Sequence, residues 1–509
     1  MLAKVSSFAI LGVKAFKVQV EVDLSPGLPM FSTVGLPDGA VRESKERVRS
    51  ALINSGFAMP VSRITVNLAP ADMRKEGAAF DLPIALGILA ASGALDPCAL
   101  DNLAVVGELA LDGAIRPVRG CLTMAVAAGQ NKFSHLLVPE TNAQEAAMAE
   151  NISVLAAGHL LQVLEHLNKV KPLPEVKADM AAIQAGLNHP GLDLADVRGQ
   201  EQAKRALTIA AAGGHNLLMV GPPGSGKTML AQRLPGILPP LTLAEALEVT
   251  QVASVAGILP PDQPLLTQRP FRSPHHTISD AGLAGGGTIP RPGEISQAHH
   301  GVLFLDELPE FKRAALEALR QPLEGGRLTV TRAAASLDFP ADFMLVAAMN
   351  PCPCGYFGSN QKPCACTPQQ VRAYLTRVSG PLLDRIDLQV QVPAVPFSHL
   401  AGQTDGISSR TVREQVVKAR SIQEKRLRPF ALFRNSQMNA SQTRRFCALN
   451  DSSLKLLELA MRRLNLSARA YSRILKLART IADLDGQADI GPAHISEAIS
   501  YRSLDRQIE

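Results

Sequence analysis

Residues 221–228 read Gly-Pro-Pro-Gly-Ser-Gly-Lys-Thr, a glycine followed after four residues by Gly-Lys-Thr. Glycines at this spacing let main-chain N–H groups converge on phosphate, and a following helix adds positive potential at its N-terminus. The apolar run NLLMV precedes the stretch and the helix-like MLAQRL follows it, which is the context such a loop requires. The sequence therefore predicts an ATP site formed by Gly221, Pro222, Pro223, Gly224, Ser225, Gly226, Lys227 and Thr228.

Two side chains of this loop and an acidic pair further along have distinct expected roles. Lys227 should reach the β- and γ-phosphates, and Thr228 should ligate Mg²⁺. A second apolar strand, GVLFLDE, ends in Asp306 and Glu307, where a parallel sheet builds its sites. We expect Asp306 to complete the Mg²⁺ shell and Glu307 to polarise the attacking water. The alternative is that the two acids begin a solvated helix.

Four more polar side chains lie beyond the acidic pair. The apolar strand FMLVAAMN ends at Asn350, whose amide can orient the lytic water, although asparagine before Pro351 also suits a turn. In SGPLLDRIDL, Arg385 stands between two aspartates. It is either a local ion-pair partner or an arginine finger that acts on a neighbouring subunit's ATP. Nearer the C-terminus, SARAYSR offers Arg469 and Arg473 for contact with the γ-phosphate.

Four of the seven cysteines crowd into NPCPCGYFGSNQKPCACTP, directly after Asn350. Two close pairs separated by a loop can close a tetrahedral thiolate site, and four soft ligands favour a structural Zn²⁺. The alternative is a set of reduced or redox-active thiols. A zinc ion here would brace a segment beside the ATP site. The expected ligands are Cys352, Cys354, Cys364 and Cys366.

Composition and charge restrict the class of protein. Apolar residues make up 46% and charged residues 19%, which are globular values. With 52 basic and 46 acidic residues the net charge is +6, which permits nucleic-acid binding without arguing for it. The absence of tryptophan disfavours binding of single strands by aromatic stacking. No signal peptide and no apolar run of about 18 residues is evident, so we expect a cytoplasmic protein that does not contact membranes.

At 509 residues the chain should form several domains, and we expect a protein of the α/β multidomain class. Residues 1–167 mix strand-like stretches such as FKVQVEVDL and RITVNL with the helix-like DGAVRESKERVRSALINSG. Residues 168–191 are rich in proline and charge, which is typical of a linker. Residues 192–395 alternate strands and helices, predicting a parallel sheet. Residues 396–509 are helix-rich and are expected to form a lid, with a last helix starting at Pro492.

The order of these motifs resembles that of the AAA+ ATPases. The stretch RPFRSPHHTISDAGLAGGGTIPRPGEISQAHHGVLFLDE is similar to the magnesium chelatase ChlI-like group and, within it, to the YifB/ComM branch. The resemblance covers nearly the whole chain. It implies a hexameric ring, a lid of the magnesium chelatase C-terminal type, a helix-two insertion within about 250–298, and a hairpin in GGRLTVTRAAASLDFPADF. It supports Asn350 as sensor and Arg385 as finger, and it favours Arg469 over Arg473 as the lid arginine.

The stretch also contains two histidine pairs, His275–His276 and His299–His300. Imidazole is a common metal ligand, so each pair invites a metal-site interpretation. The resemblance places the first pair near the insertion and the second just before the acidic strand. We favour packing or contact with substrate over metal ligation for both pairs.

The N-terminal region resembles the proteolytic domain of Lon through RKEGAAFDLPIALGILAASG and GELALDGAIRPVRGCLTMAVAAG. Lon-type proteases use a serine nucleophile activated by a lysine. The resemblance puts Ala79 at the position of the serine and Leu122 at that of the lysine. Ala79 has no oxygen to attack a carbonyl and Leu122 has no amine to accept a proton. We therefore expect a non-proteolytic scaffold that packs into the ring or contacts DNA.

Three functions compete for the energy of ATP hydrolysis. The YifB/ComM resemblance implies a homo-hexameric ring helicase that promotes branch migration in natural transformation and homologous recombination. Its substrate would be branched or single-stranded DNA, with Arg327 and Arg332, at or near the hairpin tip, contacting phosphates. The alternative is a chelatase-like or protein-remodelling ATPase, although the chain has no extended acidic integrin-like domain. The missing dyad argues against peptide unfolding tied to proteolysis. We expect the DNA motor.

Overall fold

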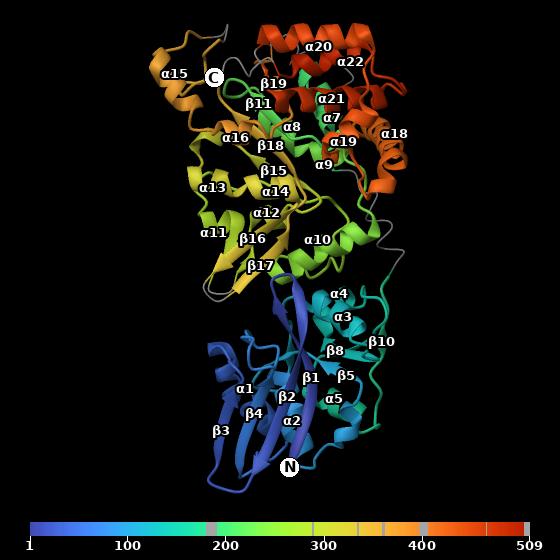
Figure 1. Cartoon of the computed structure of the whole chain (residues 1–509). Helices are drawn as coiled ribbons and strands as arrows, with labels where there is room; N and C mark the ends of the chain where they lie inside the picture. Colours follow the sequence, from blue (N-terminus) through green and yellow to red (C-terminus); the bar gives the residue numbers. More distant parts are fainter. Residues whose placement is uncertain are drawn as a thin grey trace. The chain divides into compact units, whose positions relative to one another are not determined.

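The computed structural model describes residues 1–179, 191–287, 290–332, 335–358, 362–395, 406–464 and 466–502, without the side chains of residues 332 and 335. The chain divides into two compact units (Figure 1). The expected α/β multidomain class is confirmed. No helix in the described ranges is long and apolar enough to cross a membrane. The first unit comprises Met1–Ala185, Thr242–Thr267 and Pro290–Pro292, and the second Gly186–Leu241, Gln268–Ile289 and Gly293–Glu509.

A mixed eight-stranded sheet forms the framework of the first unit, in the order β10-β9-β8-β5-β1-β2-β4-β3. The alternation predicted in FKVQVEVDL is confirmed, because Val18, Val20 and Val22 all point into the core. Strand β10 lies within the expected linker 168–191. The strands are β1 (Leu2–Leu11), β2 (Lys14–Ser25), β3 (Met30–Val34), β4 (Arg63–Ala69), β5 (Leu103–Val105), β8 (His135–Pro139), β9 (Ser153–Ala157) and β10 (Glu175–Val176), with β6 (Glu108–Leu109) and β7 (Ile115–Arg116) forming a separate pair.

One helix of the first unit comes from far along the chain. Helix α10 (Leu243–Ala256) begins with a capping box formed by Thr242 and Glu245 and packs with the N-terminal residues. Ser254 on this helix donates a hydrogen bond of 2.7 Å to the buried Glu145 carboxylate. The expected domain boundaries follow chain order and do not anticipate this return of residues 242–267. The other helices are α1 (Gly39–Asn54), α2 (Asp81–Ala91), α3 (Cys121–Gln130), α4 (Ala143–Ala146) and α5 (Leu160–Leu167).

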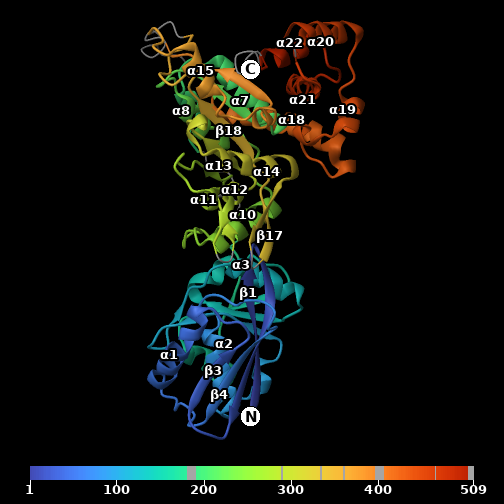
Figure 2. The same cartoon turned by 60° about the vertical axis from the view of Figure 1, so that its left-hand side comes forward.

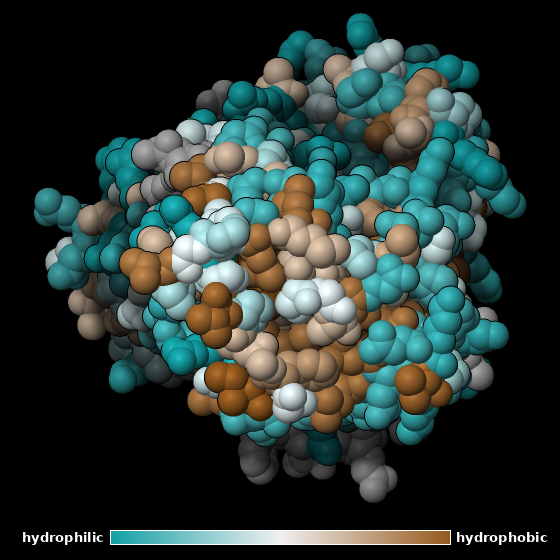
Figure 3. Space-filling view, turned by 90° about the horizontal axis from the view of Figure 1, so that it is seen from below, coloured by the Kyte–Doolittle hydropathy of each residue, from teal (hydrophilic) through white to brown (hydrophobic). Residues whose placement is uncertain are grey.

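The eight-stranded sheet ends in an apolar edge. Edge strand β3 exposes Met30 and Val34, and the loops near the edge expose Leu28 and Val61 by 88% and 87%. Figure 3 shows apolar side chains gathered on the face seen from below. Edge strand β3 therefore carries no charged residue of the kind with which many edge strands are protected.

A five-stranded parallel sheet forms the framework of the second unit, in the order β12-β15-β18-β11-β19. Its three central strands are buried throughout, as expected for a parallel sheet covered on both faces. The strand order is that of the AAA+ fold. The strands are β11 (Leu217–Val220), β12 (Phe271–Arg272), β15 (Val302–Leu305), β18 (Met344–Met349) and β19 (Leu388–Gln391).

Shorter elements connect the strands of this sheet. The hairpin implied by the resemblance is present as antiparallel β16 (Arg327–Arg332) and β17 (Ala335–Pro340). The segment 250–298 is divided between the two units; its strand β14 (Arg291–Pro292) belongs to the first. The remaining elements of the second unit are α7 (Glu201–Gly213), α8 (Lys227–Gln232), α9 (Leu234–Ile237), α11 (Asp280–Ala284), β13 (Gly285–Gly286), α12 (Glu294–Gln297), α13 (Arg313–Ala318), α14 (Arg320–Gly325), α15 (Pro368–Leu375) and α16 (Gly380–Leu383).

The C-terminal part of the second unit is helical, as the apolar spacing predicts. Figure 2 shows helices α19–α22 grouped at one side of this unit. Ile209 on α7, Val416 on α18 and Ile481 on α21 belong to one apolar core together with β11. The last helix begins at Pro492, as expected. The helices are α18 (Ser409–Leu427), α19 (Ala440–Phe446), α20 (Asp451–Leu464), α21 (Ala468–Leu484) and α22 (Pro492–Ser500).

Candidate nucleotide and metal sites

The phosphate-binding loop connects β11 to α8. Gly224 and Gly226 adopt φ values of 73° and 90°, which residues with a side chain rarely adopt. A methyl group on Gly221 would lie 2.1 Å from the carbonyl oxygen of Val392, so this glycine is required by close packing. The loop is thus shaped by its glycines, and its main chain is free to approach an anion.

Lys227 is buried at the start of α8. Its Nζ donates to the carbonyl oxygens of Gly221 and Pro222 at 2.7 and 2.9 Å and to Asn350 Oδ1 at 3.2 Å. Burial lowers the pKa of this ammonium, and the nearby acidic pair opposes the shift. The ammonium group is therefore held by carbonyl oxygens of its own loop and by the predicted sensor. These neutral acceptors are weaker than phosphate oxygens, which can replace them.

The acidic pair meets the same loop. Thr228 Oγ1 donates to Asp306 Oδ2 at 2.7 Å, so the two expected Mg²⁺ ligands lie side by side. The main-chain N–H of Glu307 donates to Asp306 Oδ1 at 2.9 Å. This meeting follows from the fold, since Gly221, Asp306 and Asn350 each follow the end of a parallel strand. An oxygen-rich site of this kind suits Mg²⁺ bound together with phosphates.

The first histidine pair adds a contact that the sequence did not predict. His276 Nδ1 lies 3.2 Å from Glu307 Oε2, and its ring lies 4.1 Å from that of His275. His299 has a different role, because its Nδ1 accepts a hydrogen bond of 3.1 Å from the main chain of Asp342. No local sequence signal predicts the contact of His276 with Glu307, because the pair His299–His300, and not His276, directly precedes the acidic strand.

The aspartates beside Arg385 do not pair with it. Asp384 Oδ2 binds Arg469 at 3.1 Å and Asp387 Oδ1 binds Arg473 at 3.0 Å, whereas Arg385 pairs with Glu324. The local ion pair considered from the sequence is therefore wrong in its partners. Arg469 is the more exposed of the two arginines, at 68%. The finger role concerns a neighbouring chain and stays a prediction.

Asp387 anchors a buried polar network. Its Oδ2 lies 3.1 Å from Nδ1 of the fully buried His215, whose Nε2 lies 2.8 Å from Thr480 Oγ1 on α21. Burial alone would raise the pKa of Asp387, but Arg473 and His215 outweigh it, so the pKa lies below its ordinary value of 3.8. The ionised carboxylate therefore stabilises the fold fully above about pH 3.8. This contribution is lost as the pH falls below 3.8 towards the lowered pKa of the folded protein.

Asp387→Asn is expected to destabilise the protein by about 3 kcal/mol, because it leaves Arg473 without its partner in a site of low exposure. Thermal unfolding followed by circular dichroism at neutral pH measures the loss. Asp384→Asn is the matched control, since its pair with Arg469 is exposed and should contribute less than about 1 kcal/mol. Equal shifts in the two variants would contradict the structural role of the network.

The four cysteines predicted to bind zinc come together. The Sγ atoms of Cys352, Cys354 and Cys364 lie 3.4–3.7 Å from one another, and all four thiols lie within 4.8 Å. Tetrahedral Zn–S bonds of about 2.3 Å place sulfurs about 3.8 Å apart, so the cluster fits the ion. Main-chain N–H groups lower the pKa of Cys354 to about 6, whereas, against a main-chain N–H that lowers it, burial and the neighbouring thiols raise the pKa of Cys364 to about 12. The support for a metal site is therefore the geometry of the four sulfurs.

The cysteine loop also packs against the phosphate loop. Gly355, between the two cysteine pairs, has a φ of 86°, and a methyl group there would lie 2.5 Å from Cδ of Pro223. Cys352 is fully buried, and its Sγ accepts a hydrogen bond of 3.3 Å from the main chain of Phe357. The expectation that this segment lies beside the ATP site is thus met by direct contact at Pro223.

The remaining predicted positions lie in the first unit and in the β16–β17 hairpin. Ala79 and Leu122, at the expected positions of the Lon dyad, are both buried apolar residues. Arg327 pairs with Pro340 at the open end of the hairpin, so the expectation that it lies at or near the tip is wrong. Arg332 pairs with Ala335 beside the tip, but its side chain lies outside the described residues.

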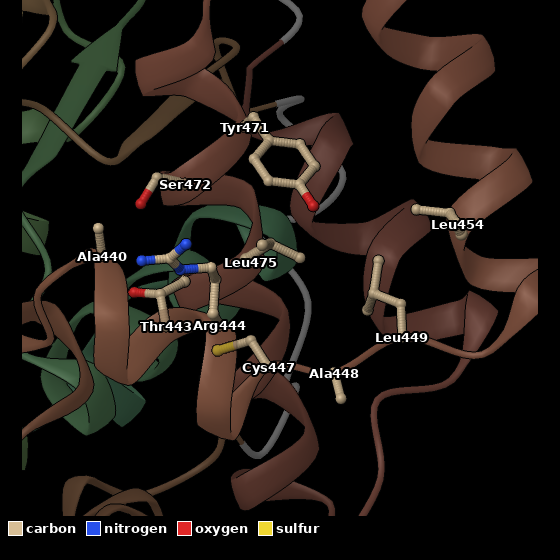
Figure 4. A pocket seen from close by; sticks show the side chains of 10 residues that line it. All are labelled: Ala440, Thr443, Arg444, Cys447, Ala448, Leu449, Leu454, Tyr471, Ser472 and Leu475. Carbon is tan, nitrogen blue, oxygen red and sulfur yellow. The ribbon is translucent and has the colours of Figure 1, made fainter.

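A pocket of about 380 Å³ lies among α19, α20 and α21 (Figure 4). Figure 4 shows Arg444, Thr443 and Ser472 at one end and Tyr471 towards Leu454. Burial raises the pKa of the lining Cys447 to about 12, so this thiol is unreactive at neutral pH. None of the lining residues belongs to the phosphate loop or the acidic pair, so the pocket is separate from the nucleotide site.

The sheet order, the phosphate loop and the Thr228–Asp306 pair define a P-loop protein of the AAA+ class, whose members use ATP and Mg²⁺. Family models described as "Magnesium chelatase, subunit ChlI", "Subunit ChlI of Mg-chelatase" and "Magnesium chelatase, subunit ChlI C-terminal" match residues 193–400, 20–142 and 406–502. The chain belongs to the YifB/ComM family within this ChlI-like group.

Two relatives match over nearly their full length, and a third matches in part. The chain is 50% identical to Competence protein ComM of Haemophilus influenzae, covering 100% of this chain and 99% of that protein. It is 47% identical to Uncharacterized protein YifB of Escherichia coli, covering 99% and 98%. The Magnesium-chelatase 67 kDa subunit of Chlorobaculum parvum is 30% identical over only 31% of this chain and 23% of that protein. The similarity to chelatase subunits is thus partial.

Proposed function

We propose that this protein is a cytoplasmic, ATP-driven DNA motor that acts as a homo-hexameric ring and promotes branch migration in natural transformation and homologous recombination. The observation that carries the proposal is the end-to-end 50% identity with a protein named for competence. Competence is uptake of DNA, so a ring ATPase serving it has DNA as its natural substrate. Contacts to phosphates carry no sequence information, which suits a motor that moves along DNA of any sequence.

The ATP site has assigned roles in this proposal. Lys227 binds the β- and γ-phosphates, and Thr228 and Asp306 hold Mg²⁺. Glu307 polarises the attacking water, which Asn350 orients. Arg385 completes the site of a neighbouring subunit, and Arg469 contacts the γ-phosphate from the lid. The contacts Thr228–Asp306 and Lys227–Asn350 support the assignments of these four residues, because they gather the four side chains at one sheet edge.

The remaining parts of the chain have supporting roles. Residues 1–167 form a non-proteolytic Lon-like scaffold, 168–191 a linker, 192–395 the ATPase core and 396–509 the lid. Cys352, Cys354, Cys364 and Cys366 hold a structural Zn²⁺, supported by their mutual distances. Hairpin β16–β17 contacts DNA in the ring pore, with Arg332 beside its tip.

The experiment is the ATPase rate of the purified full chain with Mg²⁺ and no DNA, single strands, duplex or a four-way junction at one salt concentration. The motor predicts stimulation that is greatest with branched DNA. A rate indifferent to every DNA form would contradict it. That result would favour the chelatase-like or protein-remodelling alternative, for which the partial match to a magnesium-chelatase subunit is the supporting observation.

DNA-binding titrations at several salt concentrations test the place of the DNA contact. Arg332→Ala should weaken DNA binding and reduce the slope of log K against log salt by about 1, because one phosphate contact is lost. Arg327→Ala is the matched control, since Arg327 lies at the open end of the same hairpin. Equal effects of the two substitutions would show that the tip is not the contact.

A further inference from the structure

Arg385 is held within its own chain. Its side chain is only 12% exposed, with Nη2 paired to the Glu324 carboxylate on α14 and Nη1 donating to the carbonyl oxygen of Pro381 at 2.5 Å. The N–H at Nε is buried and has no hydrogen-bond partner among the residues that the structure describes. A guanidinium with one unsatisfied buried donor is poised to exchange its partners for a phosphate, which accepts several donors at once.

The carboxylate that holds Arg385 stands next to the hairpin. Glu324 lies three residues before Arg327, the first residue of β16. Gln321, one turn earlier on α14, makes a reciprocal pair with Thr329 on β16: its Nε2 donates to Thr329 Oγ1 at 3.1 Å, and its Oε1 accepts from the Thr329 main chain at 3.3 Å. At the junction, the Gly326 carbonyl accepts from the Ala341 main chain at 2.9 Å. Helix α14 and the base of the hairpin are therefore tied together.

We propose that Glu324 is a positioning residue that withholds Arg385 until the β16–β17 hairpin engages a nucleic-acid backbone. The inference rests on the proposed function, in which Arg385 acts on a neighbour's ATP and the hairpin contacts DNA. Displacement of the hairpin passes through the Gln321–Thr329 pair to α14 and withdraws the Glu324 carboxylate. Arg385 then exchanges this carboxylate for the γ-phosphate of the neighbouring subunit. The hairpin and the neighbouring ATP site are coupled because Arg385 cannot pair with Glu324 and with the γ-phosphate at the same time.

Glu324→Gln keeps the shape of the side chain and removes its charge. We expect the ATPase rate without DNA to rise roughly tenfold, or about 1.4 kcal/mol in activation free energy, and further stimulation by DNA to be small. Glu317→Gln is the matched control, because this nearby carboxylate pairs with Arg320 at 2.6 Å and not with Arg385. The control should keep the low basal rate and the full DNA response. Equal basal rates in Glu324→Gln and the unmodified protein overturn the inference, irrespective of the stimulation by DNA.

A second variant tests the link to the hairpin. Gln321→Ala should retain the low basal rate and DNA affinity but lose most of the stimulation, because Glu324 is still in place while the tie to β16 is cut. Full stimulation in this variant overturns the coupling through α14. Arg385→Ala separates failure of the inference from failure of the proposed function. If it hydrolyses ATP normally, the finger assignment itself is wrong; if it is inactive while Glu324→Gln is unchanged, only the withholding role fails.

Discussion

Lys227→Ala is expected to lower the rate of ATP hydrolysis by about 100- to 1,000-fold, the range found when a preorganised donor to a reacting oxygen is removed. The buried Nζ sits among the Gly221, Pro222 and Asn350 oxygens, so no other lysine can take its place without rebuilding the loop. Steady-state phosphate release with saturating Mg·ATP measures the effect, with and without DNA.

Lys204→Ala is the matched control for this prediction. Lys204 is also buried, but it lies on α7 and pairs with Glu201, away from the loop. Its loss should alter stability without abolishing hydrolysis. Nucleotide binding measured by fluorescence separates loss of affinity from loss of the chemical step. Hydrolysis retained in Lys227→Ala would contradict the assignment of the loop as the hydrolytic site.

The nucleotide site could be predicted from the sequence because parallel strands end at one edge of a sheet. Lys227, Asp306 and Asn350 are far apart in sequence, yet each follows an apolar run, and that rule alone brings them together. The cysteine cluster was predictable for a similar local reason, since both C-x-C pairs lie within one short loop. Only its contact with Pro223 needed the structure.

The partners of Arg385 could not be predicted in the same way. Adjacent aspartates suggested a local pair, but the four-residue connection between α16 and β19 turns Asp384 and Asp387 towards α21 and Arg385 towards α14. Such directions depend on the packing of helices distant in sequence. The register of β16 against β17, which places Arg327 at the open end, likewise depends on cross-strand pairing that composition does not reveal. The return of residues 242–267 to the first unit has the same cause, because no local pattern records a tertiary contact.

Cys352→Ser is expected to release the metal, lower the unfolding temperature by several degrees and reduce hydrolysis about tenfold. Cys352 is the buried member of the cluster, and its sulfur lies 3.4 and 3.7 Å from those of Cys354 and Cys364, so an oxygen there weakens the whole tetrahedral set. The loss reaches the nucleotide site through Gly355, which packs on Pro223. Because no phosphate-binding group is removed, nucleotide affinity should fall less than the catalytic rate.

Metal content by elemental analysis, thermal unfolding and ATPase rate together measure this result, and treatment of the unmodified protein with a chelator should reproduce it. Cys98→Ser is the matched control, because Cys98 is exposed in the first unit and outside the cluster. It should retain the metal and the rate. If the unmodified protein contains no zinc, or if Cys352→Ser matches Cys98→Ser in all three measurements, the cluster is a set of free thiols. In the expected case, zinc holds the cysteine loop against the phosphate loop, and chelation lowers the turnover rate more than the affinity for ATP.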